Sequence, residues 1–144
     1  MIKNLKDLEL NEALYNQIIE LYSTFSQFDP HKFHFKQLNE FIQKLLPNHQ
    51  IYVYLDEDKI VGAITLLIEH KIIHSGGKVG HIEDFVVLES HRSQGVGHHL
   101  ITYAQNEAQR QNCYKVILDC ASHLEAYYTK KGFTAKGTYM ARYF

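Results

Sequence analysis

The chain has 144 residues, of which 45% are hydrophobic and 22% charged, and its mean hydropathy is −0.29. This length fits one domain over residues 1–144 with a substantial core, and the composition is that of a soluble globular protein. The net charge of −1 argues against a nucleic-acid partner bound through a strong positive field. No apolar run approaches the ~20 residues of a membrane span, and the N-terminus lacks the apolar region of a signal peptide.

The cysteines and histidines form no disulfide or metal pattern. Cys113 and Cys120 lie in one short segment that reads as a strand, which disfavours a bridge between them, and neither has a ligand partner at metal-binding spacing. The ten histidines are scattered, and the pair His98 and His99 is not a zinc motif. We therefore expect free thiols, no bound metal and a reducing, cytoplasmic location.

Two helices come first in the predicted order of elements. Residues 10–25 have the apolar spacing of a helix, at Leu10, Leu14, Ile18 and Leu21. Asp29 is the predicted N-cap of the next helix and Pro30 its first residue. That helix is expected to run through residues 31–46 and to end near Pro47.

Three strands are predicted next. Residues 50–74 contain two β-rich runs around a polar turn at residues 56–59, which predicts a hairpin. Residues 75–80 are a second turn, and residues 81–89 are the third strand.

A strand–helix–strand unit follows. Residues 95–112 have helical spacing, and residues 113–120 are almost continuously apolar, which is typical of a parallel strand buried on both faces. The connection predicts a right-handed βαβ crossover. A last helix ends at Gly132, and residues 133–144 are predicted to be a final strand. The expected fold is a mixed-sheet α/β or α+β domain, mostly antiparallel and twisted, with one parallel crossover and flanking helices.

The loop before the crossover helix carries Arg92, Gly95 and Gly97. Backbone N–H groups at a helix N-terminus lack partners and lie at the positive end of the helix dipole, so such a turn can bind phosphate. Glycines let the backbone approach an anion closely, and Arg92 adds a cation. Alone, this pattern fits an anion site and a ligand-free tight turn about equally well.

Two nucleotide-binding loops differ from this pattern. The loop lacks G-K-[ST], which excludes a Walker A motif. It begins like G-x-G-x-x-G but has Leu100 in place of the third glycine, and Asp119 follows at about the distance of a ribose-binding acid. A dinucleotide site is therefore an alternative, although too little chain follows to build a nucleotide domain.

Three acids and a tyrosine pair are the other candidates. Glu83 and Asp84 are adjacent in a strand, so their side chains are expected on opposite faces, and each alone fits an edge acid that discourages aggregation. Asp119 lies near the carboxyl end of an apolar strand, where ligands collect in parallel sheets, although it also fits a helix cap. Tyr127 and Tyr128 alone fit core or rim packing.

Together these segments resemble the GNAT-fold acyl-CoA N-acyltransferases. "RSQGVG" is similar to the R-x-x-G-x-G pyrophosphate loop of that family, and "AYYTKKGF" to its Y-x-x-x-G-F segment. "LLIEHKIIH", "GHIEDFVV", "NCYKVILDC" and "MARYF" further resemble the glucosamine 6-phosphate N-acetyltransferases of eukaryotic type. The similarity runs through residues 50–144 and is looser around "ELYSTF" and "FDP".

The resemblance implies a homodimer that acetylates the 2-amino group of D-glucosamine 6-phosphate with acetyl-CoA, a step toward UDP-N-acetylglucosamine, without a metal. The implied catalytic residues are Asp119 and Tyr128. The implied acetyl-CoA residues are Phe85, Val86, Val87, Arg92, Ser93, Gln94, Gly95, Val96, Gly97, His98, Tyr128, Thr129 and Lys130. The implied substrate residues are Ser23, Lys71, Ile72, Ile73, His74, Glu83, Asp84, Phe85, Tyr114, Lys115, Asp119 and Arg142.

The chemistry suggests a role for each group. An amine attacks a thioester only when it is neutral, so a carboxylate, or a water that it holds, must accept a proton. We expect Asp119 to orient the amine, and Glu83 or Asp84 to hold sugar hydroxyls. Backbone donors after Asp84 are expected to hold the oxyanion, and Tyr128 to protonate the departing thiolate. The candidate counter-charges for the sugar phosphate are Lys71, Lys115 and Arg142.

Two departures from that family and two further alternatives accompany this hypothesis. Leu124 replaces an Asn four residues before Tyr128, and Tyr143 replaces one of two basic residues near the C-terminus; both bear on substrate affinity more than on the reaction. The alternatives are a GNAT enzyme for a protein amine or a polyamine, and a non-catalytic acetyl-CoA-binding module. "IEHKIIH" and "GHIED" argue against the first, and Asp119 with Tyr128 against the second.

Overall fold

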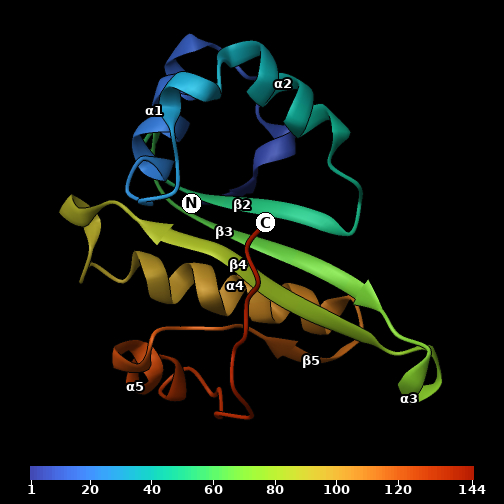
Figure 1. The fold of residues 1–144 in the computed structure, drawn as a ribbon. Coiled ribbons are helices and arrows are strands. Elements are labelled where there is room, and N and C mark those ends of the chain that lie inside the picture. The colour runs from blue at the N-terminus through green and yellow to red at the C-terminus, as the bar shows by residue number, and fades with distance from the viewer.

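The computed structural model describes residues 1–144 and has one five-stranded sheet with helices on both faces (Figure 1). The strands lie in chain order: β1 (Ile2–Asn4), β2 (His49–Asp56), β3 (Lys59–His70), β4 (Lys78–Val87) and β5 (Cys113–Ile117). Pairing is antiparallel from β1 to β4, and β4 and β5 are parallel. The predicted mixed sheet with one parallel crossover is confirmed.

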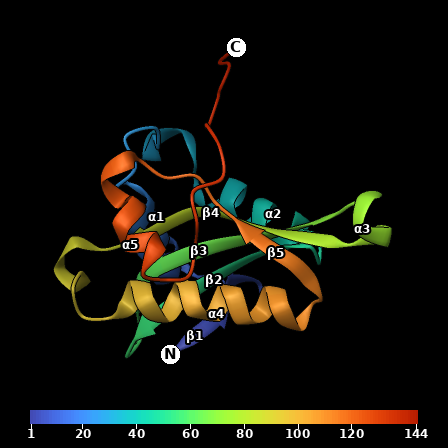
Figure 2. The ribbon, with the colours of Figure 1, turned by 90° about the horizontal axis from the view of Figure 1, so that it is seen from below.

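The helices are α1 (Glu12–Tyr22), α2 (Phe35–Lys44), α3 (Ile73–Gly76), α4 (Val96–Arg110) and α5 (Glu125–Thr129). Short 3-10 turns lie at Leu5–Asp7, Pro30–Lys32, Glu89–His91 and Ser122–Leu124. α1 and α2 lie over one face of the sheet, and α4 lies along the other (Figures 1 and 2). None of these helices combines the length and the apolar character that a membrane crossing requires.

The helix predicted to start at Pro30 is divided in two. The Asp29 carboxylate accepts a backbone hydrogen bond at 3.0 Å and caps a 3-10 turn that begins at Pro30, as predicted. The turn ends at Phe33, where the backbone is not helical, and α2 starts two residues later. Phe33 interrupts the helix while its ring packs edge-on against Phe28 and Phe41, with centroids 6.3 and 6.2 Å apart.

The predicted hairpin is present, with Asp56 opposite Lys59 at the turn between β2 and β3. β1 was not predicted, because three residues are too few to show an alternating pattern. It pairs with β2 from Ile2 opposite Tyr54 to Asn4 opposite Tyr52.

A β-bulge interrupts β4 in the middle of the predicted acidic segment. Glu83 pairs with Thr65 and Val86 with Ala63, so two residues of β4 lie opposite one residue of β3. Asp84 has a left-handed backbone with φ of 45°. The predicted placement of Glu83 and Asp84 on opposite faces is wrong, because the bulge removes the strict alternation of a regular strand.

The crossover from β4 through α4 to β5 is as predicted. α4 packs on the sheet through four fully buried residues on successive turns of one face: Leu100, Ile101, Ala104 and Ala108. Gly62 of β3 makes this contact close, since a Cβ there would lie 2.9 Å from a Leu100 methyl carbon. The N-terminus of α4 is therefore held at the C-terminal end of β4.

β5 is more exposed than predicted. It pairs with β4 alone, and Tyr114, Lys115 and Ile117 are exposed. The prediction of burial on both faces is wrong because β5 is an edge strand, and α1 packs mainly over β3 instead.

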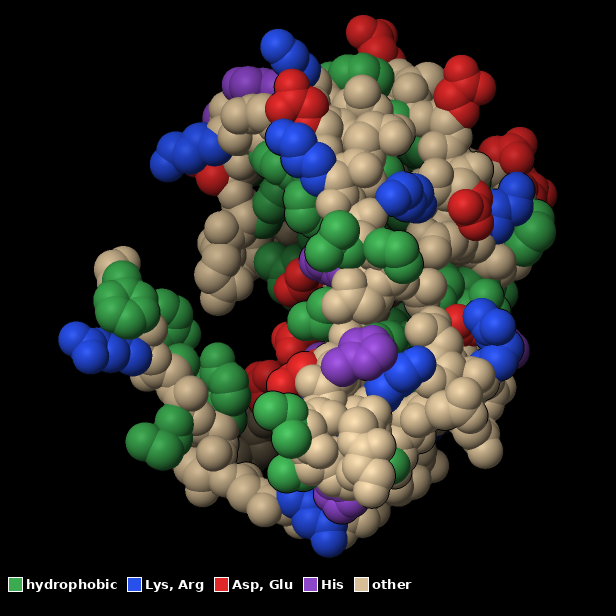
Figure 3. Space-filling view, turned by 90° about the vertical axis from the view of Figure 1, so that its right-hand side faces the viewer, with side chains coloured by type: hydrophobic (Ala, Val, Ile, Leu, Met, Phe, Trp, Pro, Cys, Tyr) green, Lys and Arg blue, Asp and Glu red, His purple; other side chains and the backbone are tan.

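The predicted final strand is also wrong. No backbone hydrogen bond involves residues 134–144, and this C-terminal segment extends away from the body of the molecule (Figures 2 and 3). A strand needs a neighbour to pair its backbone groups, and this segment has none in its own chain. Gly132 adopts the predicted left-handed conformation beyond α5, with φ of 87°.

Candidate active site

The loop between β4 and α4 presents free backbone amides. Gly95, the N-cap of α4, and Ser93 both have left-handed backbone angles, with φ of 86° and 62°. No side chain caps this helix end, and its first hydrogen bond runs from the His99 N–H to the Gly95 carbonyl at 3.0 Å. The amides of residues 96–98 therefore have no helical partner, and the first turn contains no acid. This end of α4 can bind a phosphate group.

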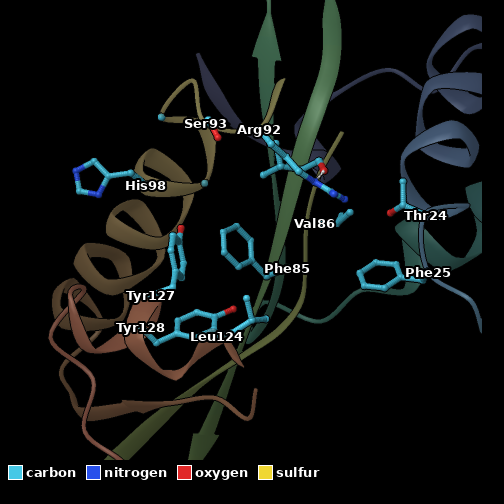
Figure 4. A pocket seen from close by; sticks show the side chains of 13 residues that line it. Thr24, Phe25, Phe85, Val86, Arg92, Ser93, His98, Leu124, Tyr127 and Tyr128 are labelled. Carbon is cyan, nitrogen blue, oxygen red and sulfur yellow. Dashed lines mark hydrogen bonds between the residues drawn. The ribbon is translucent and has the colours of Figure 1, made fainter. Parts of the chain in front are cut away.

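A cavity of about 520 Å³ lies beside this loop, between β4, α5 and the segment after α1 (Figure 4). The predicted acetyl-CoA residues that line it are Phe85, Val86, Val87, Arg92, Ser93, Gly95, Gly97, His98 and Tyr128. Those that do not line it are Gln94, Val96, Thr129 and Lys130. Val96 is buried in the core, and the Gln94 amide donates to the Ser90 carbonyl at 2.8 Å.

Four residues outside the predicted set also line the cavity: Thr24, Phe25, Leu124 and Tyr127. Ser23, expected at the sugar phosphate, does not line this cavity, and its hydroxyl donates to the Ile19 carbonyl at 2.6 Å. The neighbouring Thr24 lines the cavity, and its hydroxyl donates to the Leu21 carbonyl at 2.9 Å. Only the loose resemblance of "ELYSTF" pointed to this segment. No feature of the sequence indicated that Tyr127 lines the cavity, other than its position next to Tyr128.

Glycine at position 97 permits close packing as well as access for an anion. A Cβ at this position would lie 3.1 Å from the Tyr127 hydroxyl oxygen and 3.2 Å from the Phe85 ring. Both distances are tighter than ordinary van der Waals contact. Gly97 therefore allows two rings of the cavity wall to approach the start of α4.

Tyr128 extends from α5 into the cavity (Figure 4). Burial raises the pKa of its hydroxyl to about 12, with smaller contributions from Tyr127, Cys120 and Asp119. The hydroxyl is therefore protonated throughout the physiological range and can donate a hydrogen bond or a proton.

Carboxylates gather on β4 and just beyond the end of β5. Burial raises the pKa of Glu83, and the neighbouring Asp119 and Asp84 carboxylates raise it further, while His81 lowers it in part. Figure 3 shows acidic side chains in the hollow between the body and the C-terminal segment. Like charges at close range favour a cation among them, and an ammonium group is a suitable partner.

Asp84 lines a second cavity of about 680 Å³, between the sheet and the layer of α1 and α2. Tyr22 and Thr65 line it as well. Burial raises the pKa of Tyr22, and the Asp84 carboxylate adds to this, while a hydrogen bond with Thr65 lowers it in part. The bulge therefore separates Asp84, in the second cavity, from Phe85, in the first.

The other predicted substrate residues lie at the far end of β4. We call residues 71–74, Tyr114 and Lys115 the distal cluster. The His74 ring packs on Tyr114 with centroids 4.1 Å apart, and the Lys115 ammonium lies 5.7 Å from the same ring centroid. Ile72 is fully exposed beside them. The length of β4 separates this cluster from the glycine loop within one chain.

Arg142 lines neither described cavity. It lies in the C-terminal segment, with its guanidinium carbon 5.2 Å from the Phe144 ring centroid. No three His, Cys, Asp or Glu side chains are placed to hold a metal ion, and Cys113 and Cys120 are free.

Comparisons with known proteins agree with this geometry. Residues 14–133 match the model of the acetyltransferase (GNAT) family. Over 88 residues, the chain is 46% identical to a probable glucosamine 6-phosphate N-acetyltransferase 2 of Oryza sativa subsp. japonica, which covers 61% of this chain and 53% of that protein. Over 90 residues, it is 42% identical to the glucosamine 6-phosphate N-acetyltransferase of Candida albicans, which covers 62% of this chain and 60% of that protein.

The matches thus span between half and two thirds of these curated relatives. The crystal structure of glucosamine-6-phosphate N-acetyltransferase from Arabidopsis thaliana superposes with a TM-score of 0.80 at 29% identity, over 100% of this chain and 99% of that one. The family match covers most of the chain, including the glycine loop, Asp119 and Tyr128. The chain belongs to the acetyltransferase (GNAT) family.

Proposed function

We propose that the chain is an acetyl-CoA-dependent N-acetyltransferase that converts D-glucosamine 6-phosphate to N-acetyl-D-glucosamine 6-phosphate. The observation that carries this proposal is the glycine loop on a cavity that Tyr128 also lines, with the carboxylates of Glu83 in β4 and of Asp119, two residues beyond β5, close to each other. The names of the curated relatives support the acceptor. The place of the reaction would be the cytoplasm, in the synthesis of UDP-N-acetylglucosamine.

The cavity fits coenzyme A by its chemistry. The free amides of residues 96–98 and the Arg92 guanidinium suit a diphosphate, and the apolar walls suit an uncharged chain. Bound acetyl-CoA would supply an activated acetyl group as a thioester. We assign Tyr128 to the leaving sulfur, because its hydroxyl retains a proton to donate.

The acids suit an amine that arrives as an ammonium ion. The Asp119 carboxylate would orient the nitrogen. Glu83 would accept its proton, since a raised pKa makes this carboxylate a stronger base than an ordinary glutamate. The β4 bulge leaves a backbone group outside the ladder between Asp84 and Phe85, and we assign an amide here to the developing oxyanion.

A homodimer would bring the two groups of predicted substrate residues together. The distal cluster lies at the Lys78 end of β4, five residues before Glu83, which is about 17 Å at the usual rise per residue and longer than one sugar phosphate. The free edge of β5, the exposed Ile72 and Ile73, and the extended segment with Arg142 all suit a second copy of the chain. In such a dimer, cations of one chain would face the acids of the other.

The test incubates the purified protein with acetyl-CoA and glucosamine 6-phosphate and follows release of free thiol. Mass spectrometry then checks that the sugar has gained one acetyl group. N-acetylglucosamine 6-phosphate is the matched control, because its nitrogen cannot be acetylated in the same way. Glucosamine without phosphate tests the contribution of the distal cluster.

Two outcomes would contradict this acceptor. Thiol release with a lysine peptide or a polyamine, but not with the sugar phosphate, would favour a GNAT enzyme for another amine. Acetyl-CoA binding without turnover of any amine would favour a non-catalytic binding module.

A further inference from the structure

Lys131 lies beside the cofactor cavity and has no acidic partner. Its ammonium nitrogen is 2.8 Å from Nδ1 of His98 and 5.5 Å from the centroid of the Tyr127 ring. None of the salt bridges of the chain includes Lys131. Its backbone carbonyl accepts a hydrogen bond from Gln105 at 2.9 Å, which ties this residue to α4.

The contact with Lys131 indicates which tautomer the His98 ring adopts. An ammonium group can only donate, so Nδ1 of His98 is the acceptor and the ring proton is on Nε2. The His98–Lys131 pair thus offers the Nε2–H of one side chain and the two remaining N–H groups of the other. Two adjacent donors with one positive charge and no acid are suited to an anion.

This pair is separate from the amides of the glycine loop. Figure 4 shows His98 pointing away from the centre of the cavity on the outer side of α4, whereas Arg92 extends across the cavity toward Val86. The cavity margin therefore has two anion-binding positions, one at the loop and one outside it.

Coenzyme A also has two separate anionic groups, its diphosphate and the 3′-phosphate of its ribose. We propose that the His98–Lys131 pair binds the 3′-phosphate, so that the protein selects coenzyme A over 3′-dephospho-coenzyme A. This inference rests on the proposed function, because it requires the diphosphate to occupy the loop.

The test measures binding by isothermal titration calorimetry, with coenzyme A and 3′-dephospho-coenzyme A as the two probes. The wild-type chain should bind coenzyme A at least about tenfold more tightly, as expected for a charge-assisted contact. Lys131→Met should lose about tenfold in affinity for coenzyme A and less than about twofold for the dephospho form. Lys131→Arg should retain most of the preference.

Lys36→Met is the matched control, because Lys36 is an exposed lysine of α2 that lines neither described cavity. It should leave both affinities unchanged. If Lys131→Met does not fold, as judged by circular dichroism, His98→Gln serves as the second variant and should show the same selective loss.

The outcomes separate this inference from the proposed function. Equal wild-type affinity for both probes, or an equal loss for both in Lys131→Met, would overturn the role of the pair while leaving the acetyltransferase proposal intact. Failure of the wild-type chain to bind coenzyme A at all would overturn both.

Discussion

Burial raises the pKa of both Tyr128 and Glu83, with different consequences for the chemistry of each side chain. It raises the pKa of Tyr128 to about 12, and it is also the first cause of the raised pKa of Glu83. Tyr128 therefore keeps its proton at neutral pH, whereas Glu83 gains basicity toward the range in which an ammonium group must lose a proton. One side chain suits the leaving sulfur and the other suits the attacking amine.

Replacing Tyr128 by phenylalanine should lower kcat by about a hundredfold, the lower end of the range for loss of a general acid. The KM for acetyl-CoA should change less than about twofold, because the ring and its packing are kept. Steady-state kinetics of Tyr128→Phe, with Tyr103→Phe on α4 as the control, would measure both. Since the pKa of Tyr128 is about 12, its titration should cause no fall in wild-type rate below about pH 10. An unchanged kcat would remove Tyr128 from this role.

Replacing Glu83 by glutamine should lower activity but raise the melting temperature at pH 8. A carboxyl group with a raised pKa in the folded state favours folding when it is protonated, and this contribution is lost as the pH rises through the folded pKa. Glutamine carries no charge at any pH, so Glu83→Gln avoids this loss of stability. The Tm of the variant should therefore exceed that of the wild type at pH 8 and equal it near pH 4. Thermal unfolding at both pH values measures it.

Glu9→Gln, at an exposed acid without a hydrogen-bond partner, is the control for Glu83→Gln and should show no such pH dependence. A lower Tm for Glu83→Gln at pH 8 would mean that Glu83 makes a favourable contact that outweighs the neighbouring carboxylates.

Among the elements, the bulge in β4 and the first turn of α4 shape the site together. The bulge places Asp84 at one cavity and Phe85 at the other. The start of α4 then approaches Phe85 closely because residue 97 has no Cβ. The two local irregularities thus determine the width of the cavity between strand and helix.

Replacing Gly97 by alanine should raise the KM for acetyl-CoA by about tenfold, because the new methyl group displaces Tyr127 and Phe85 into the cavity. The free energy of unfolding should not fall by much, since alanine favours helix by about 1 kcal/mol relative to glycine. Gly137→Ala is the matched control, with no atom within 4 Å of its added Cβ. Unchanged KM together with normal stability would show that the cavity tolerates the methyl group.

Over the whole molecule, sequence patterns predicted the helices, strands and turns that depend on contacts between residues close together in the sequence. The helical spacing of α1 and α4, the turn at residues 56–59 and the apolar run of β5 are visible in short windows, and they were sufficient for the mixed sheet with its crossover. The divided second helix was missed because it depends on the packing of Phe33 against rings elsewhere in the chain.

The sequence predicted those residues of the candidate site that belong to short motifs. Five residues of the loop and Tyr128 line one cavity, whereas Gln94 and Val96 of the same loop do not. Thr24 and Phe25 were missed because only the loose resemblance of "ELYSTF" marks their segment and tertiary packing brings them to the site. The bulge at Asp84 was missed because aspartate is only somewhat enriched at positive φ, which is too weak a signal to mark one residue within a strand.

The C-terminal segment exposes more apolar surface than a chain end in solution would be expected to carry. Tyr139, Met140, Tyr143 and Phe144 are all exposed, and residues 134–144 make no backbone hydrogen bonds. A chain end with this much apolar surface gains little stability alone but buries that surface when it lies on another molecule. In the proposed homodimer, the segment of one copy would lie against its partner.

Deleting residues 138–144 should therefore leave the fold of one chain intact while weakening the dimer. Sedimentation of the wild-type chain should give the mass of two copies, and the deletion should shift it toward the mass of one. Turnover of glucosamine 6-phosphate should fall, because Arg142 is lost and the distal cluster no longer faces a partner's acids. Circular dichroism should stay unchanged, since the deleted residues belong to no helix or strand. A wild-type monomer with full activity would contradict the dimer, and a deletion that keeps both mass and turnover would exclude the segment from it.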